Sequence, residues 1–373
     1  MRIGIDARFF GSIGKGLGRY TQKLIENIEA LDDQNQYFVF LRKENWEEYQ
    51  PRNKNFQKVL ADIPWYGLRE QFQFPKIIKK HKLDLMHFPH FNVPVFYKGK
   101  FVVTIHDLIL LHHSTKRAST LSPFFYFFKK TAYNFVIRRA VRKSEKIIAV
   151  SKHTKGDIEK YFGTPSEKII VTYEAIDASQ KALSEPGEKI LKKYGIMKPY
   201  LLYVGNAYPH KNLERLVLVF REIRKKHPHL HLVFVGKEDY FYRRLKKFVS
   251  DNFAKNVIFA DYVPDDHLGI VYRDALLYVF PSLYEGFGLP PLEAMARNIP
   301  VASSSASCLP EILGEAAAYF DPKAMSEMAE TIEKAIVDGE LRRELMEKGQ
   351  EQIKKYSWKK MARETLNIYK NIK

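Results

Sequence analysis

The sequence predicts an α/β fold with two doubly wound parallel sheets, and three observations lead to this prediction. Short apolar runs alternate with amphipathic helical patterns in both halves of the chain, as they do in parallel sheets whose strands are joined by helices. The chain has 373 residues, which is enough for two domains of ordinary size. A charged stretch containing Pro186 and Gly187 separates the two halves and ends at Pro199, before a new apolar run. We therefore expect domains at residues 1–177 and 178–356.

The predicted strands are short apolar runs of strand length. In the first half they are residues 2–6, 37–41, 85–88, 101–105, 146–150 and 169–172. In the second half they are residues 200–204, 231–235, 257–260, 275–280, 300–302 and 317–320. Helical patterns fit between them, for example at residues 18–31, 212–226 and 239–251. Ser151 stands before one such helix and is expected to cap it.

The composition is that of a globular protein. Hydrophobic residues make up 45% of the chain, and no apolar run approaches the roughly 18 residues of a membrane span. The single cysteine, Cys308, excludes an intrachain disulfide and any multi-cysteine metal site, and it fits a reducing compartment. The N-terminus begins as a strand with an early acid, Asp6, so we do not expect a signal peptide.

The formal net charge of +18 predicts an anionic partner, with nucleic acid, anionic lipid and nucleotide-sugar as candidates. Residues 116–146 hold nine Lys or Arg against one acid, Glu145, and include an aromatic cluster between Pro123 and Phe128. Basic residues among aromatics suit the surface of an anionic membrane. The alternative is that the aromatic residues belong to the core and the basic residues form a solvated face.

Residues 285–293 carry the clearest chemical pattern. Two carboxylates, Glu285 and Glu293, enclose a glycine-rich turn and two prolines, after a predicted strand and before a predicted helix. Open α/β sheets place ligands at this end of their strands. Glycines let backbone amides approach an anion, and carboxylates bind hydroxyl groups, so the pattern favours a ligand with both phosphate and sugar. The alternative is a tight turn followed by an ordinary glutamate in the first turns of a helix.

A second glycine-rich loop follows the first strand. Gly14, Lys15 and Gly16 lie in it, directly before a helix, so backbone amides and a helix dipole can face an anion. The spacing is not that of a dinucleotide fingerprint. His106 ends another strand, where an imidazole can bind a hydroxyl or move a proton, although a lone histidine is more often structural. The neighbouring histidines lack the spacing of a metal site, and we expect no metal.

The segment from Ser282 to Ala296 resembles the E-x7-E element of retaining glycosyltransferases with the GT-B fold, and it is similar to glycosyltransferase family 4 along its whole length. The resemblance covers nearly the whole chain. It implies two Rossmann-like domains facing across a cleft, with residues 1–177 on the acceptor side and 178–356 binding the nucleotide-sugar. It also implies that the amphipathic segment 357–373 crosses back to the first domain.

The resemblance assigns roles to individual residues. Glu285 would bind donor-sugar hydroxyls, Glu293 the ribose, and His106 the transferred sugar. Lys211 matches a lysine that holds the diphosphate, whereas Asn206 stands where the family commonly has an arginine, which leaves one cation fewer. Backbone positions expected at the donor are Gly14, Lys15 and Gly16 in the first domain, and Gly205, Gly236, Tyr262, Val263, Gly286, Phe287, Gly288 and Leu289 in the second.

The predicted function is therefore a retaining hexosyltransferase. The string from Gly205 to Leu213 resembles a branch rich in mannosyl- and other hexosyltransferases of cell-surface polysaccharide synthesis, which favours GDP-mannose as donor and a saccharide or lipid-linked saccharide as acceptor. Enzymes with this fold generally need no metal, so no cofactor is expected. We expect a cytoplasmic protein that is peripheral at the inner face of the cell membrane.

Three alternatives remain open for the function. The first is a transferase that uses a UDP-sugar, and the second is a nucleotide-sugar epimerase with the same fold. The third, more remote, is a basic nucleic-acid-binding protein, which would show a steep salt dependence and leave Glu285 and Glu293 without a role. Whether Glu285 acts as a nucleophile or as an electrostatic partner also stays open.

Overall fold

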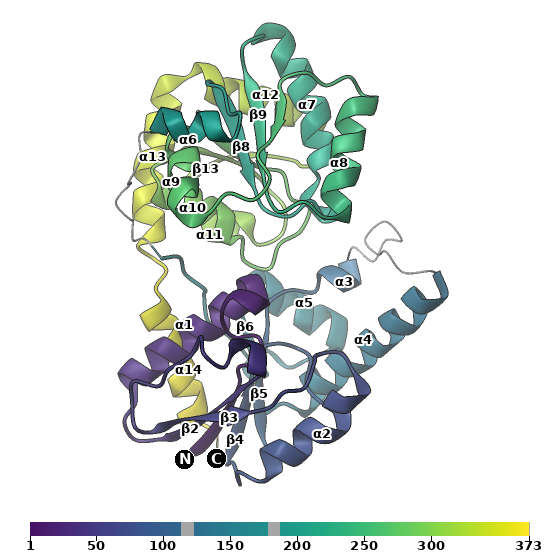
Figure 1. Ribbon diagram of the computed structural model, residues 1–373, viewed down its shortest axis with the longest axis vertical. Coiled ribbons are helices and arrows are strands. Elements are labelled where there is room, and N and C mark those ends of the chain that lie inside the picture. The colour runs from purple at the N-terminus through teal and green to yellow at the C-terminus, as the bar shows by residue number, and fades with distance from the viewer. Residues whose placement is uncertain (113–122, 178–186, 373) are drawn as a thin grey trace. The chain divides into compact units, whose positions relative to one another are not determined.

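The computed structural model describes residues 1–112, 123–177 and 187–372, without the side chains of residues 123–129. The chain forms two compact units, drawn in Figure 1. The first unit comprises Met1–Leu108, Ser119–Ala175 and Ser357–Lys373, and the second comprises Ile109–Ala118 and Ile176–Tyr356. Each unit is built on one parallel sheet, so the predicted fold class is confirmed.

The sheet of the first unit has seven parallel strands in the order β3-β2-β1-β4-β5-β6-β7. The strands are β1 (Arg2–Asp6), β2 (Gln36–Leu41), β3 (Phe56–Leu60), β4 (Leu85–Phe88), β5 (Phe101–Ile105), β6 (Lys146–Ala149) and β7 (Ile169–Val171). The central strands β4 and β5 are buried along their whole length, because helices cover both faces of the sheet (Figure 1).

Strand β3 was absent from the sequence-based prediction. It reads Phe-Gln-Lys-Val-Leu, and only Phe56 and Val59 are buried. As an edge strand it pairs with β2 alone, so polar side chains are tolerated along it and the apolar run is too short to recognise.

The sheet of the second unit has six parallel strands in the order β10-β9-β8-β11-β12-β13. The strands are β8 (Tyr200–Val204), β9 (His231–Val235), β10 (Val257–Phe259), β11 (Leu277–Phe280), β12 (Val301–Ser304) and β13 (Ala317–Phe320). All of them overlap the predicted apolar runs.

Helices connect the strands. In the first half of the chain they are α1 (Lys15–Leu31), α2 (Leu68–Lys79), α3 (Ile109–His112), α4 (Pro123–Lys143) and α5 (Lys152–Phe162). In the second half they are α6 (Gly187–Lys193), α7 (Leu213–Lys226), α8 (Tyr240–Asp251), α9 (Asp265–Arg273), α10 (Leu289–Ala296), α11 (Leu309–Leu313), α12 (Met325–Val337), α13 (Gly339–Ile353) and α14 (Trp358–Lys370). Helix α1 begins before the predicted Gly18, and Ser151 caps α5 by accepting a hydrogen bond from the Thr154 amide, as predicted.

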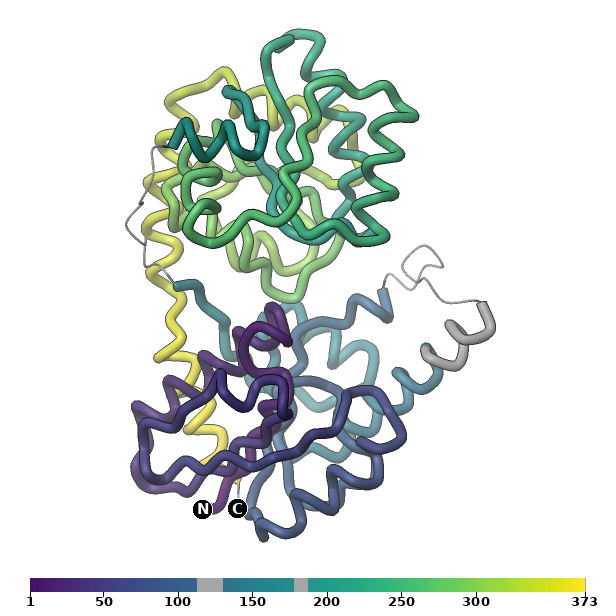
Figure 2. The backbone as a smooth tube through the Cα atoms, in the orientation of Figure 1, coloured from purple at the N-terminus to yellow at the C-terminus, as the bar shows by residue number. Residues whose placement is uncertain are grey.

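Helix α14 belongs to the first unit although it ends the chain. It lies along α1 in both the ribbon and the backbone trace (Figures 1 and 2). Its buried face includes Trp358, Met361 and Leu366, and Tyr369 is almost fully buried. The apolar face of α14 thus completes the core of a sheet whose strands come from the other end of the sequence.

Strand order places the functional loops. In each sheet the order reverses beside the first strand, between β1 and β4 in one unit and between β8 and β11 in the other. Ligands of open parallel sheets bind beyond the carboxyl ends of the strands at this switch point. The loops that follow these four strands and their neighbours are therefore the segments in which site residues are expected.

Candidate active site

In the second unit, the structure brings two predicted site residues together at the switch point. Lys211 lies in the turn Pro209–Lys211 after β8, and Glu285 lies in the loop after β11. The Lys211 Nζ donates to Glu285 Oε1 at 2.6 Å, and both side chains are about nine-tenths buried. A cation and a carboxylate thus lie side by side where a ligand is expected.

The loop that carries Glu285 is fixed by the segment after β12. The Glu285 amide donates to Ser307 Oγ at 2.9 Å, and the buried Cys308 thiol donates to the Glu285 carbonyl at 3.3 Å. The turn that carries Lys211 is held as well, because the Leu283 amide donates to the His210 carbonyl at 2.7 Å. Ser307 had no chemical role in the sequence-based interpretation, and its hydroxyl holds the backbone of Glu285.

Helix α10 begins directly after this loop. Gly288 precedes it with φ of 92°, a backbone conformation that favours glycine, and a Cβ there would lie 2.8 Å from Leu309 Cδ2. Glu293 is half-buried on α10. Pro290 and Pro291 have no N–H, so an anion at this helix start would be bound mainly by amides between residues 286 and 289.

Three loop ends meet beside this site. The Gly205 amide donates to the Val235 carbonyl and the Gly236 amide to the Asp261 carbonyl, and the Tyr242 hydroxyl donates to the Gly205 carbonyl at 2.7 Å. Of the remaining predicted donor positions, Asn206 and Tyr262 are exposed, whereas Val263 is buried and offers only its backbone. Their contact with a nucleotide stays a prediction.

In the first unit, the glycine-rich loop forms a tight turn before α1. Gly14 passes so close to the Phe9 carbonyl that a Cβ would lie 2.1 Å from its oxygen, whereas Gly16 faces open space. Lys15 is exposed and has a left-handed φ of 51°. Glu48 fixes the loop by accepting hydrogen bonds from the Ser12 amide and hydroxyl.

His106 follows β5 and has partners at both ring nitrogens. Its Nδ1 lies 2.7 Å from Glu174 Oε1, and its Nε2 lies 2.9 Å from the Pro89 carbonyl oxygen. Burial alone would lower the pKa of His106, but the hydrogen bond and charge of Glu174, together with Pro89 and Asp107, outweigh burial, so the pKa is raised. The sequence-based interpretation missed Glu174, although an acid directly beyond a strand's carboxyl end was the signal that marked Glu285.

Two other histidines near His106, the buried His87 and the partly buried His90, are uncharged. Burial, together with the charge of His106, lowers the pKa of His87 and of His90 to about 3. His87 Nδ1 contacts the Tyr369 hydroxyl at 2.5 Å, and its Nε2 contacts Thr104 Oγ1 at 2.8 Å. These two contacts join α14 to the central sheet. Within the described ranges, no group of three or more His, Cys, Asp or Glu side chains is arranged to hold a metal ion.

A buried ion cluster supports the same end of the first sheet. The Arg8 guanidinium is fully buried and contacts Asp6 at 2.8 Å and Glu70 at 2.7 Å, while the Asn92 amide donates to both Glu70 oxygens. Burial raises the pKa of Glu70, although Arg8 opposes this shift. The cluster joins the loop after β1, helix α2 and the loop after β4. The loop after β4 also carries Pro89 and His90, which lie next to His106.

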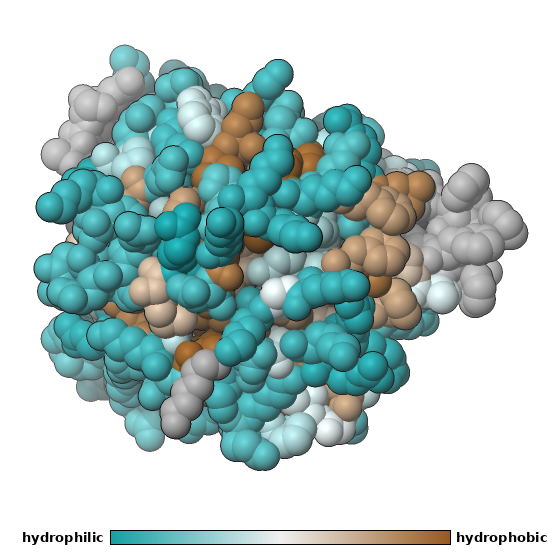
Figure 3. All heavy atoms as spheres, turned by 90° about the horizontal axis from the view of Figure 1, so that it is seen from below, coloured by the Kyte–Doolittle hydropathy of each residue, from teal (hydrophilic) through white to brown (hydrophobic). Residues whose placement is uncertain are grey.

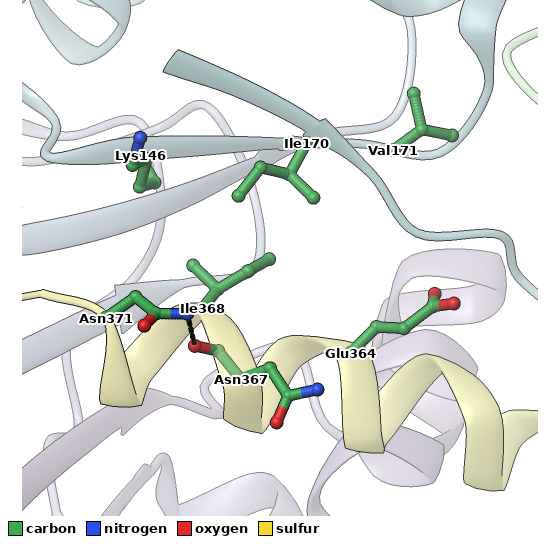
Figure 4. Close-up of a pocket in the computed structure, with 7 residues that line it drawn as sticks. All are labelled: Lys146, Ile170, Val171, Glu364, Asn367, Ile368 and Asn371. Atoms are coloured by element: carbon green, nitrogen blue, oxygen red, sulfur yellow. Dashed lines mark hydrogen bonds between the residues drawn. The ribbon is translucent and has the colours of Figure 1, made fainter. Parts of the chain in front are cut away.

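One pocket lies away from all of these residues. It has a volume of about 300 Å³ and is formed by Lys146, Ile170 and Val171 of the β6–β7 edge and by α14, with Glu364 and Asn367 among the lining side chains (Figure 4). It contains no predicted site residue and no cluster of reactive groups, so we assign it no role.

Two family profiles match the two halves of the chain. A profile described as glycosyl transferases group 1 matches residues 187–352, and one described as glycosyltransferase family 4 matches residues 14–180. The O-antigen chain mannosyltransferase B of Escherichia coli is 26% identical over 95% of this chain and 96% of its own length.

Solved structures share the fold along the whole chain. Sucrose-phosphate synthase from Thermosynechococcus elongatus has a TM-score of 0.78 at 18% identity and covers 100% of this chain and 99% of its own. The Anabaena protein HepE in complex with UDP-glucose has a TM-score of 0.73 at 16% identity and the same coverage. The fold is thus that of GT-B glycosyltransferases. The two profiles show that the chain is a glycosyltransferase, with a region of glycosyltransferase family 4 at residues 14–180 and one of glycosyl transferases group 1 at residues 187–352.

Proposed function

We propose that this enzyme is a retaining hexosyltransferase that moves mannose from GDP-mannose to a saccharide or lipid-linked saccharide. The observation that carries the proposal is the contact between Lys211 and Glu285 beyond β8 and β11. Without a ligand, the two side chains compensate each other's charge. A nucleotide-sugar offers a partner to each, phosphate oxygens to the ammonium and sugar hydroxyls to the carboxylate.

The same geometry suggests how the residues act on the donor. Lys211 stabilises the negative charge that develops on the leaving diphosphate, together with amides between Gly286 and Leu289. Glu285 binds the sugar close to the anomeric carbon, and Glu293 binds the ribose. No step in this scheme requires a metal or another cofactor, and we propose none. The roles of Gly14, Gly16 and His106 at the donor rest on the family resemblance.

The choice of mannose rests on a relative that matches nearly the whole chain and is an O-antigen mannosyltransferase. A UDP-sugar is the second candidate, because a protein of the same fold has been solved with UDP-glucose. An epimerase would isomerise the donor sugar without forming a glycoside. Product analysis separates these functions, since only a transferase yields a new glycosidic bond, and its anomeric configuration reports retention.

Thermal denaturation tests the donor. A ligand that binds only the folded state raises the melting temperature by mass action. We expect GDP-mannose and GDP to raise it more than UDP-glucose and UDP, and Glu293→Ala to weaken this effect. Glu340→Ala, at an exposed position of α13, is the matched control. If no nucleotide-sugar or nucleoside diphosphate raises the melting temperature, the proposed function fails.

We also propose that the first unit contacts an anionic membrane. Large apolar side chains are exposed on α2, α4 and the loop after β4, and Phe72 stacks on Phe96 with ring centroids 4.7 Å apart. The exposed fractions are 79% for Leu68, 52% for Phe72, 52% for Phe96 and 60% for Phe135. Figure 3 shows brown apolar side chains grouped among hydrophilic ones on the face drawn. Such a surface suits the interface of a bilayer.

Hydrogen bonds hold this surface together, and basic residues flank it. The Val95 amide donates to Gln71 Oε1 at 2.7 Å, and the Val95 carbonyl accepts from Arg139 Nε at 2.6 Å, so the loop after β4 is fixed between α2 and α4. Exposed cations on α4 include Arg138, Arg142 and Lys143. Of the basic stretch 116–146, residues 116–122 lie outside the described residues. In the described ranges, no helix combines the length and apolar character needed to cross a membrane.

Vesicle sedimentation tests the membrane contact. We expect binding to vesicles with anionic lipid, weaker binding to neutral vesicles, and loss of binding in the double variant Phe72→Ser, Phe96→Ser. Tyr240→Ser, an exposed aromatic of the second unit, is the control. Equal binding by the wild-type chain, the double variant and Tyr240→Ser would contradict the proposed membrane-binding surface. Salt-dependent binding to DNA or RNA in place of vesicles would favour the nucleic-acid alternative.

A further inference from the structure

The imidazole of His106 is held at both nitrogens by groups of the first unit. The Pro89 carbonyl oxygen, 2.9 Å from Nε2, can only accept a hydrogen bond, so Nε2 carries a proton. Glu174 Oε1 lies 2.7 Å from Nδ1, and Glu174 is 5% exposed. An ionised carboxylate also only accepts, so Nδ1 carries a proton as well. The ring is then an imidazolium with no lone pair left to take a proton.

The groups around the ring favour this charged form. Glu174 comes from the loop after β7, and Asp107 adds a second negative charge from the loop after β5. His87 and His90, on the β4 side, are uncharged, because burial lowers their pKa values to about 3. From α1, Tyr20 meets the ring edge-on with centroids 4.6 Å apart, and its own pKa is raised by burial, so it is neutral. The Thr154 hydroxyl of α5 donates to the His106 carbonyl.

We propose that Glu174 is a positioning residue that keeps His106 as a doubly hydrogen-bonded imidazolium, so that His106 serves sugar transfer through its orientation and positive charge and not by accepting a proton. The inference rests on the proposed function for the part His106 plays at the donor. The protonation of the ring does not depend on that function, because it follows from the contacts of the first unit alone. The acceptor's proton must then leave through a group other than His106.

The variant Glu174→Gln separates charge from shape. Glutamine can donate its amide N–H to Nδ1 while Nε2 still donates to Pro89, so the ring keeps its place and becomes neutral. The pKa of His106 should fall. The protonated fraction, and with it kcat, should then fall about tenfold for each pH unit above the new pKa. Glu167→Gln removes an exposed acid in the same unit and is the matched control.

Two measurements test the proposal. In the unliganded full chain, long-range ¹H–¹⁵N spectra of histidine, assigned with His106→Gln, should show both His106 nitrogens protonated at neutral pH. The ring should titrate at a lower pH in Glu174→Gln and at an unchanged pH in Glu167→Gln. A neutral ring in the wild-type chain at neutral pH, or the same titration in Glu174→Gln, overturns the proposal.

The pH profile of kcat is the second measurement. If Glu174 had only a structural role, its replacement would not shift this profile. In the wild-type enzyme, activity should decline as pH rises through the raised pKa of His106, and in Glu174→Gln this decline should begin at lower pH with little change in KM. If the wild-type enzyme is active and Glu174→Gln has the same pH profile of kcat, the proposed role of Glu174 is wrong. If the wild-type chain turns over no nucleotide-sugar, the proposed function fails, while the spectra still decide whether Glu174 keeps His106 charged.

Discussion

In each unit a predicted site residue forms a buried ion pair beyond the carboxyl ends of the strands, and the two pairs differ in the hydrogen-bond donors that they leave for a ligand. Lys211 and Glu285 are joined at 2.6 Å, and His106 and Glu174 at 2.7 Å. An ammonium has three donors and Glu285 takes one of them, so Lys211 can still bind phosphate oxygens. His106 has two donors, and Glu174 and Pro89 take both. A ligand can therefore still bind Lys211 in the second unit, whereas both ring donors of His106 in the first unit are already used.

The largest expected effect comes from Glu285→Gln. If Glu285 acts on the sugar in the transition state, the variant should lose about 100- to 1,000-fold in kcat, the loss expected when one preorganised electrostatic partner is removed. Initial rates with saturating donor measure it. Glu351→Gln, at an exposed position of α13, is the control. A kcat within a few-fold of wild type would show that Glu285 only balances Lys211.

Lys211→Met should act on binding more than on folding. Removing the cation should weaken nucleoside diphosphate binding by about 10- to 100-fold, the loss expected for a hydrogen bond to a charged group. Because Glu285 would be left buried without its partner, the unliganded variant should also melt lower. Calorimetric titration with GDP measures the binding, with the exposed Lys225→Met as control. Unchanged affinity would mean that Lys211 is a structural counter-ion, like a member of the Arg8 cluster.

These two sites also show what the sequence can reveal. The second site is encoded by contiguous strings, such as the one from Glu285 to Glu293, whose glycines and acids mark chemistry directly. Both pairs join residues that are distant in the sequence, by 74 positions for Lys211 and Glu285 and by 68 for His106 and Glu174, but Glu174 carries no local signal beyond its place after a strand. Strand β3 was missed for a similar reason, since pairing with β2 and not its own composition makes it a strand. Local patterns therefore predicted the central strands and the Ser151 cap, and failed for β3 and Glu174, whose own sequence carries little signal.

Tyr369→Phe, in the first unit, should lower stability without changing catalysis. The variant keeps the buried ring and removes the hydroxyl that contacts His87 Nδ1 at 2.5 Å. The unfolding free energy should fall by about 1–2 kcal/mol, as for a lost buried hydrogen bond. Urea denaturation measures it, with Tyr240→Phe as control. A tenfold loss of kcat at unchanged KM would instead show that the chain from α14 through Thr104 reaches His106.

The smallest expected effect is the pH dependence of stability from His106. Its folded-state pKa is raised above the usual value of about 6.5, so its contribution is fully present below that pH and is lost as pH rises through the raised pKa. The unfolding free energy of the wild-type chain should therefore decline relative to that of Glu174→Gln as pH rises through this window. Denaturant titrations of both proteins at a series of pH values measure the difference. If the unfolding free energy of the wild-type chain instead rises with pH relative to that of Glu174→Gln, Glu174 stabilises the fold without charging His106. The proposed difference between the Lys211–Glu285 and His106–Glu174 pairs would then disappear.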